Sequence, residues 1–322
     1  MINQEIFAEC VVRAGLAPTV HNIQPARWVR DGQVLSLFCD TNICLPVCDP
    51  TGAASALSCG AVLEGMVLAL SAKGFEAAVT LTGNDTAPMQ GLVAVAHLTV
   101  SAGAQDGLHH QLEHRFTWRG AFADDPVELF GWTRPDARLV MDHASRLWLA
   151  QRNDWASHEI MQDNEFRREL VSWMRLSDRH PRAGLDGMDR RALRMTKGQA
   201  RGVRPSMLKF WPVLNWFGRT NSMTSQLDLT LSAPVIALFH RDIHENPVES
   251  GRAYLRMCLE AASLGLAGWP MAALSDYPTT RAEIHETFGI PSDRRLVQAV
   301  RFGKPTGVAP PRARRPLSEV VG

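Results

Sequence analysis

The sequence Ala17-Pro-Thr-Val-His-Asn-Ile-Gln-Pro25 places two prolines, a hydroxyl, an imidazole and two amides within nine residues. It follows an apolar helical run and precedes a pattern typical of a β-hairpin. Because proline fixes φ and disfavours the α region for the residue before it, Pro18 and Pro25 predict an extended backbone whose polar groups are free to bind. Two interpretations stay open: a rigid binding loop, or a turn satisfied by its own Asn and Thr side chains.

Length and composition place the chain among ordinary globular proteins. Its 322 residues exceed what one core usually organises, so we expect two domains or two fused halves. An apolar content of 45% and a charged content of 21% exclude disordered and fibrous classes. The formal net charge of +1 gives no reason to expect nucleic acid or a membrane as a partner, so any basic patch must be local.

The cysteines and the N-terminus indicate the compartment. The six cysteines include no Cys-x-x-Cys pair and no zinc-finger spacing, so we expect reduced, buried thiols. The N-terminal residues lack a basic region, and the most apolar segment, Ala61 to Ala72, is short and carries Glu64. We therefore expect neither a signal peptide nor a membrane span, and a cytoplasmic location.

Hydrophobic periodicity predicts a mixed α and β chain. We expect helices over Glu5 to Gly15, Ala53 to Lys73, Gly107 to His114, Ser145 to Trp155, Glu159 to Leu176, Glu249 to Leu264 and Thr280 to Phe288. We expect strands over Arg27 to Val29, Val34 to Cys39, Ala77 to Thr82, Leu92 to Val100, Arg138 to Asp142, Pro234 to His240 and Arg295 to Phe302. Asp31-Gly32 predicts a tight hairpin turn, Gly268-Trp-Pro270 a compact turn, and Gly303 to Val321 a Pro- and Arg-rich tail.

Part of this pattern repeats. The helix at Ala53 to Lys73, its glycine stop and the two strands after it are echoed by the helix at Glu249 to Leu264, its glycine stop and the strand at Arg295 to Phe302. The repeat is one of architecture more than of residues, and it suggests a fused pair of similar units.

The segment Asp178 to Thr224 is the least regular part of the chain. It carries a run of arginines and lysine, then Phe210, Trp211, Trp216 and Phe217. A solvated basic helix leading into a packed aromatic turn is one interpretation. A lid over a site is the second, since long irregular insertions are often functional. A nucleic-acid surface has no binding motif to support it.

Three further stretches carry chemistry. Arg115-Phe-Thr-Trp-Arg119 holds two guanidinium groups and a hydroxyl, which suit a phosphate and an electron-rich ring edge, although such triplets are also common as surface clusters. Gly265 to Ala273 is rich in small residues, which let a backbone approach a planar ligand. Pro311-Arg-Ala-Arg-Arg-Pro316 adds a basic pair close to the C-terminus.

Together, and in this order, the four stretches resemble the FMN-dependent nitroreductase family, closest to its fused, pseudo-dimeric Acg-like subgroup. The resemblance implies an α+β fold of two fused halves, each an antiparallel sheet flanked by helices. It implies contacts with FMN from Pro18, Thr19, Val20, Asn22, Gln24, Arg115, Thr117, Arg119, Pro270, Ala272, Ala273, Arg312 and Arg314. The family often has an acidic residue and a glycine where this chain has Ala272 and Ala273, so any role of that acidic side chain is lost.

The loop at 17–25 occurs only before the arginine pair at Arg115 and Arg119, so the resemblance implies one composite FMN site per chain. We expect a first half at 1–105 and a second half at 106–322 with a lid inserted at about 178–224. A fused pair has already buried the family's dimer interface, which favours a monomer.

The function implied is ping-pong reduction of small nitroaromatic or quinone-type acceptors by NADPH or NADH. A flavin-dependent oxidase or dehydrogenase of a small organic substrate, and a protein that only sequesters FMN, remain alternatives. No metal is expected: His110 and His114 lie four apart on a predicted helix, but no third ligand is evident. The sequence has no Rossmann, P-loop or serine-hydrolase motif.

Overall fold

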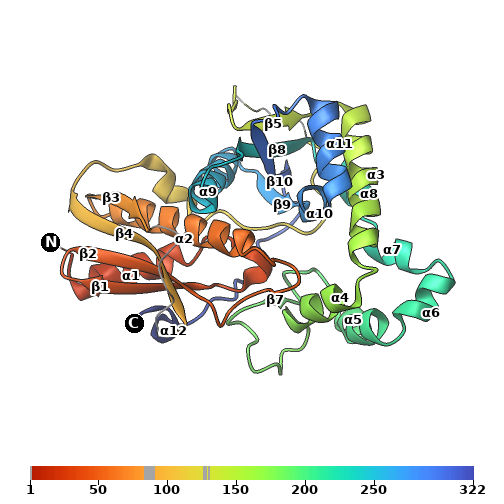
Figure 1. Cartoon of the computed structure of the whole chain (residues 1–322), viewed down its shortest axis with the longest axis horizontal. Coiled ribbons are helices and arrows are strands. Elements are labelled where there is room, and N and C mark those ends of the chain that lie inside the picture. Colours follow the sequence, from red (N-terminus) through yellow and green to blue (C-terminus); the bar gives the residue numbers. More distant parts are fainter. Residues whose placement is uncertain (1, 83–90, 126–128, 130) are drawn as a thin grey trace.

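The computed structural model of the chain describes residues 2–82, 91–125, 129 and 131–322. Its two main sheets are four-stranded and antiparallel, each is flanked by helices, and a small parallel pair of strands lies apart from them (Figure 1). The expected α+β class with two sheet-containing halves is therefore confirmed. The first sheet has the strand order β1-β2-β4-β3 and the second the order β5-β8-β10-β9.

The first sheet is built from strands β1 (Ala26–Asp31), β2 (Val34–Asp40), β3 (Phe75–Leu81) and β4 (Leu92–Ala102). Gly32 adopts a φ of +60° in the turn between β1 and β2, so the predicted hairpin is confirmed. Helix α1 (Gln4–Ala14) begins at Asn3, whose side chain accepts a hydrogen bond from the Ile6 amide.

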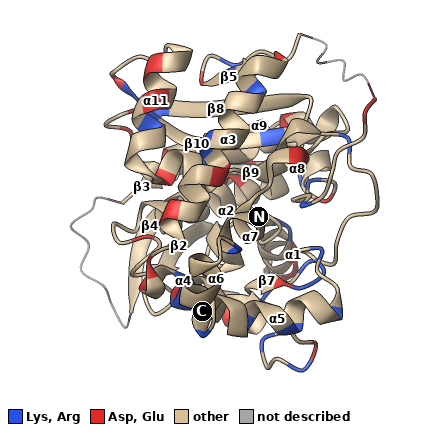
Figure 2. Cartoon of the chain, turned by 90° about the vertical axis from the view of Figure 1, so that its right-hand side faces the viewer, with Lys and Arg blue, Asp and Glu red and all other residues tan. Residues whose placement is uncertain are grey.

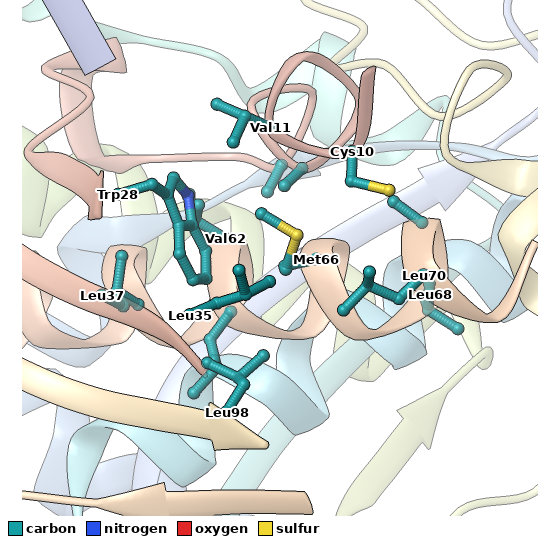
Figure 3. Packing of buried hydrophobic residues seen from close by; sticks show 14 of the residues in the cluster. Cys10, Val11, Trp28, Leu35, Leu37, Val62, Met66, Leu68, Leu70 and Leu98 are labelled. Carbon is teal, nitrogen blue, oxygen red and sulfur yellow. The ribbon is translucent and has the colours of Figure 1, made fainter. Parts of the chain in front are cut away.

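Helix α2 (Ala53–Ser71) is the centre of the first core. Figure 3 shows Val62 and Met66 of α2 among Trp28 and Leu35 of the sheet, with Cys10 of α1 nearby. By length and composition alone α2 could cross a membrane, but 72% of its apolar stretch is buried inside the protein, as in a core helix. Burial on nearly all sides explains why its apolar residues form no single stripe.

The second sheet is built from strands β5 (Ala137–Val140), β8 (Val235–Asp242), β9 (Ala267–Pro270) and β10 (Arg294–Gly303). Helix α9 (Pro247–Ser263) packs on one core, and helices α3 (His143–Ile160), α10 (Ala272–Asp276) and α11 (Pro278–Phe288) surround another. The predicted turn at Gly268-Trp-Pro270 is wrong, because these residues form β9. Proline is tolerated there because β9 is an edge strand.

The two sheets share one topology. In the first sheet, β3 lies at an edge and pairs with β4, which pairs with β2. In the second sheet, β9 lies at an edge and pairs with β10, which pairs with β8. The helix between the second and third strands is α2 in one half and α9 in the other, and these two helices pack against each other. The Glu64 carboxylate of α2 joins them through Arg252 at 2.9 Å and Arg256 at 2.7 Å on α9.

The chain also contains shorter elements. They are η1 (Val20–Asn22), η2 (Gly107–Gln111), α4 (Asn164–Ser172), β6 (Met174–Arg175), β7 (Met188–Asp189), α5 (Lys197–Leu208), α6 (Trp211–Trp216), α7 (Thr220–Thr224), α8 (Leu227–Leu231) and α12 (Leu317–Val320). The helix expected over Gly107 to His114 is only a 3-10 turn, which ends before His114.

Two expected helix boundaries are wrong for one reason. We expected a break between Trp155 and Glu159, but α3 continues to Ile160, because that interval contains no glycine or proline. The next helix, α4, begins after Asp163, whose carboxylate accepts hydrogen bonds from the first backbone amides of that helix.

The C-terminal segment returns to the first half. Helix α12 packs against α1 and β1, and the Gly322 amide donates to the Trp28 carbonyl at 2.9 Å. The two halves are therefore interleaved, since the end of the Pro- and Arg-rich tail packs on the first half. All six cysteines are free, but Cys44 is exposed, so burial of every thiol is also wrong.

Candidate functional site

The loop at 18–24 is a tight left-handed turn, so the prediction of an extended backbone is wrong. His21, Asn22 and Gln24 have φ values of 43°, 57° and 55°. Part of the turn satisfies itself, since the Thr19 hydroxyl accepts from the Gln24 amide at 3.2 Å. Asn and His tolerate this region better than most residues, and tertiary contacts hold the rest.

Those tertiary contacts come from far along the chain. The Asn22 side-chain amide donates to the carbonyls of Gly187 at 3.0 Å and Ala313 at 3.2 Å. The Gln24 side chain donates to the Leu185 carbonyl at 2.9 Å and accepts from the Arg315 amide at 2.9 Å. The loop is thus joined to the segment around β7 and to the C-terminal segment.

Three arginines converge beside this loop. The Arg115 and Arg314 guanidiniums both donate to the Leu16 carbonyl, at 2.7 Å and 3.1 Å. The Arg312 guanidinium donates to the Arg115 carbonyl at 2.9 Å. The structure therefore brings the arginine signature and the C-terminal basic pair to one place, although nearly 200 residues separate them.

These cations lack acidic partners. Among the described residues, Arg115, Arg119, Arg312 and Arg314 form no ion pair, and the carboxylate in the same cleft, Asp189, pairs with Arg191 at 3.1 Å. Burial lowers the pKa of Arg119 to about 10. Burial, followed by the charges of Arg115 and Arg312, lowers the pKa of Arg314 to about 9. Arginine stays charged in proteins, so the lowered pKa values describe uncompensated positive charge.

A cleft with about 650 Å³ of empty volume, part of it open to solvent, surrounds these groups. It is lined by Pro18, Thr19, Asn22, Arg115, Phe116, Thr117, Arg119, Gly187, Met188, Asp189, Ala192, Pro310, Pro311, Arg312, Ala313 and Arg314. A smaller, more apolar recess adjoins it and shares Pro18, Arg115, Phe116 and Thr117. The recess is completed by Tyr254, Cys258, Gly268, Pro270, Val300 and Phe302.

The recess is attached to the arginine signature through the backbone. The Trp118 amide donates to the Gly268 carbonyl at 3.1 Å, so residues 116–118 run beside β9. A Cβ at Gly268 would lie 2.7 Å from the Phe302 ring, so only glycine leaves this packing undisturbed. One chain thus presents a polar, cationic cleft next to an apolar recess.

Most of the predicted site residues line this pair of cavities, but four do not. Val20, Gln24, Ala272 and Ala273 are absent from both linings. The Val20 amide donates to the Ser58 hydroxyl at 2.9 Å, which fixes the loop on α2. Ala272 and Ala273 open α10.

Other lining residues escaped the sequence analysis. Gly187, Met188 and Asp189 lie in the segment treated as an irregular lid, and nothing local marks them as a cleft wall. Tyr254 and Cys258 lie four apart on α9, a spacing that a buried helix face shows equally well.

The model of the nitroreductase family matches residues 133–304, more than half of the chain. The chain belongs to the nitroreductase family. The family match contains β9 and the apolar side of the recess, whereas the loop at 18–24, the Arg115 signature and the Arg312 pair lie outside it.

Individual family members are similar over limited lengths. A Mycobacterium tuberculosis protein named "Putative NAD(P)H nitroreductase acg" is 34% identical over 89 residues, which is 28% of this chain and 27% of that protein. The match thus spans about a quarter of that relative's length. A structure of "a putative nitroreductase from Anabaena variabilis" is 10% identical with a TM-score of 0.48, over 94% of this chain and 88% of that one. The FMN-dependent nitroreductase NfnB from Mycobacterium smegmatis, solved with NADPH, is 19% identical with a TM-score of 0.39, over 65% of this chain and 94% of that one.

Proposed function

We propose that this nitroreductase-family protein is an FMN-dependent oxidoreductase that reduces small nitroaromatic or quinone-type acceptors with NADPH or NADH by a ping-pong mechanism. One observation carries the proposal: guanidinium groups from Arg115, Arg119, Arg312 and Arg314 line one cleft and have no carboxylate partners among the described residues. A phosphate monoester is the ligand chemistry that such a group recognises best.

Three features of the cleft support binding of the phosphate end of FMN there. The Nε atom of Arg314 is buried and has no hydrogen-bond partner among the residues that the structure describes, which leaves a donor available. Arg115, Arg312 and Arg314 would bind the phosphate with the Thr117 hydroxyl. Burial lowers the pKa of all three arginines, and the charge of Arg312 lowers the pKa of Arg115 and Arg314 further. A bound dianion would compensate these positive charges.

The remaining residues suit the ring of the cofactor. Pro18, Thr19 and Asn22 would hold it from the loop of the first half, and Gly268 and Pro270 from β9 of the second. Arg119 supplies a fixed positive charge for an electron-rich ring edge. When bound, FMN supplies hydride transfer, while the protein orients the ring and excludes water. The resemblance also assigned Val20, Gln24, Ala272 and Ala273 to FMN contact, and this remains a prediction.

We further propose that the chain is a fused pseudo-dimer of the Acg-like subgroup. The shared strand order of the two sheets and the packing of α2 against α9 support this. We retain halves at 1–105 and 106–322 with a lid at about 178–224, a cytoplasmic location and a monomer. Gly187 and Met188 of the lid segment line the cleft, which supports its role in covering the site.

Flavin quantification tests the proposal directly. Purified protein should show flavin absorbance and close to one FMN per chain. Anaerobic NADPH or NADH should bleach the flavin, and a nitroaromatic or quinone should reoxidise it. Absence of flavin even after reconstitution would refute the proposal, and two per chain would refute the composite site. A bound flavin that no nicotinamide reduces would favour the oxidase or the FMN-sequestering alternative.

A further inference from the structure

The segment between Asp189 and Asp228 carries eight Lys and Arg residues and no acidic residue. Three of these arginines are engaged: Arg190 and Arg191 lie near Asp178 and Asp189, and Arg194 stacks on Trp118 at 4.1 Å. The other five are exposed and form no ion pair among the described residues. A net charge of +1 for the whole chain therefore conceals a strongly basic region.

Helix α5 arranges three of these five cations on one face. Lys197, Arg201 and Arg204 follow each other at four- and three-residue intervals, while Ala200 and Met207 are buried on the adjacent flank of the helix. Figure 2 views the molecule from this side, and the blue bands on α5 mark its Lys and Arg residues.

Helix α6 exposes apolar side chains to solvent, whereas an ordinary surface helix exposes polar ones. Trp211 faces inward and stacks under Arg167 at 4.9 Å. The outward positions are apolar: Trp216 is 86% exposed, Phe217 is 70% exposed, and Phe210 and Val213 are also exposed. Apolar side chains of this size are seldom left uncovered together on a protein with no partner there.

Cations border this apolar group. The Lys209 ammonium lies 5.4 Å from the centre of the Phe210 ring, and Arg219 follows the end of α6 by three residues. We call Lys209, Phe210, Val213, Trp216, Phe217 and Arg219 the α6 surface. Figure 1 shows α6 and α7 at the outer end of the molecule, beyond both sheets, so this surface projects.

We propose that the α6 surface docks the protein onto an anionic lipid bilayer. Exposed Trp and Phe side chains enter the interfacial region of a bilayer, and neighbouring Lys and Arg side chains bind anionic headgroups. The sequence-based expectation of no membrane partner rested on the net charge of the whole chain. Acidic residues elsewhere in the chain cancel the positive charge of this region in that sum.

Two other occupants fit less well. A second copy of the chain would bring the same cations face to face, which repels. Single-stranded nucleic acid is bound in a groove with aromatic rings as stacking platforms, whereas the α6 surface projects and includes the aliphatic Val213.

Vesicle co-sedimentation tests the proposal with full-length, FMN-loaded protein. Vesicles of equal phosphatidylglycerol and phosphatidylcholine should sediment the protein at low salt, whereas pure phosphatidylcholine vesicles should not. Trp216→Ser combined with Phe217→Ser should abolish sedimentation. The matched control, Val12→Ser with Val308→Ser, removes two exposed apolar side chains elsewhere and should sediment like the wild type.

Charge variants give a second measurement. Lys209→Gln with Arg219→Gln should weaken binding roughly 25-fold, since each cation near an anionic surface contributes roughly fivefold. Arg138→Gln with Arg168→Gln is the control at two exposed arginines outside the segment and should have no effect. Tryptophan emission should shift to shorter wavelength on binding, and Trp216→Phe should lose that shift while still sedimenting.

Four results would overturn the proposal: no sedimentation with either vesicle, equal sedimentation with both, unchanged sedimentation of the Trp216→Ser and Phe217→Ser variant, or binding to a thymidine 20-mer without binding to vesicles. The wild-type protein could instead form a dimer and fail to bind vesicles. If the Trp216→Ser and Phe217→Ser variant were then monomeric, the α6 surface would be a self-association site. Bound FMN per chain serves as the folding control, since no α6 residue lines the proposed flavin site.

Discussion

Gly60 of α2 and Gly251 of α9 each lie against the backbone of the other's helix. A Cβ at Gly60 would come within 1.9 Å of the Val248 carbonyl oxygen, and one at Gly251 within 2.0 Å of the Leu57 carbonyl oxygen. The contact is reciprocal, as at an interface between two identical subunits, although one chain supplies both sides. This crossing brings the two helices between the sheets into backbone contact.

We expect Gly60→Ala or Gly251→Ala to lower the free energy of unfolding by at least about 2 kcal/mol, because a backbone carbonyl cannot yield to a methyl group as a side chain can. Urea denaturation followed by circular dichroism measures this. Gly202→Ala on α5 is the control: nothing lies within 4 Å of its added Cβ, so it should raise stability by about 0.5–1 kcal/mol. Equal effects in all three variants would contradict the close crossing.

The Glu64 carboxylate is 2% exposed and bonds to Arg252 and Arg256 across the same helix pair. We expect Glu64→Gln to cost about 3 kcal/mol, since breaking a buried pair leaves its partners uncompensated. The exposed pair of Arg168 with Glu165 offers a comparison: Glu165→Gln should change stability by less than about 0.5 kcal/mol. A double-mutant cycle with Arg256→Gln should give a coupling energy; its absence would mean that the pair contributes little.

Arg314→Gln should weaken FMN binding roughly 10- to 100-fold, the effect of losing one or two charged hydrogen bonds to a phosphate. Fluorescence titration of apoprotein with FMN measures the dissociation constant. Riboflavin, which lacks the phosphate, should bind wild type and variant equally. Arg168→Gln, at an exposed arginine, should bind FMN like the wild type. If the variant lost affinity for riboflavin as well, the loop rather than the phosphate contact would have been damaged.

The pKa of His21 is lowered to about 4, first by burial and then by the charge of Arg119, with Glu169 acting in the opposite direction. His21 is therefore neutral in the folded chain at pH values where the unfolded chain binds a proton. Its contribution makes stability fall as pH decreases from about 6.5 to 4, by at most about 3 kcal/mol.

Urea denaturation at pH 7.5 and at pH 4.5 should show this window. His21→Asn, which tolerates the positive φ, should lose less stability between the two pH values than the wild type. Identical pH dependence in both proteins would contradict a neutral imidazole at His21.

The sequence by itself determined the turns and helices that depend on residues close together in the chain. Asp31-Gly32 predicted its hairpin because the turn needs a positive φ at glycine. The apolar spacing of residues 53–73 predicted the buried helix α2, and Gly265 marked the end of α9. The clustering of Arg115 with Arg312 and Arg314 was predicted only from the resemblance to the family. Neither stretch contains a local pattern that indicates contact with the other.

Only the tertiary structure decided which residues meet. The left-handed turn at His21 to Gln24 replaces the extended loop because Gly187, Leu185 and Ala313 supply partners from beyond residue 180. Strand β9 replaces a turn because β10 offers an unpaired edge. The uncovered aromatic face of α6 also depends on Trp211 being turned inward. Local propensity is fixed by neighbours along the chain, whereas these outcomes depend on hydrogen bonds and burial between segments that only folding brings together.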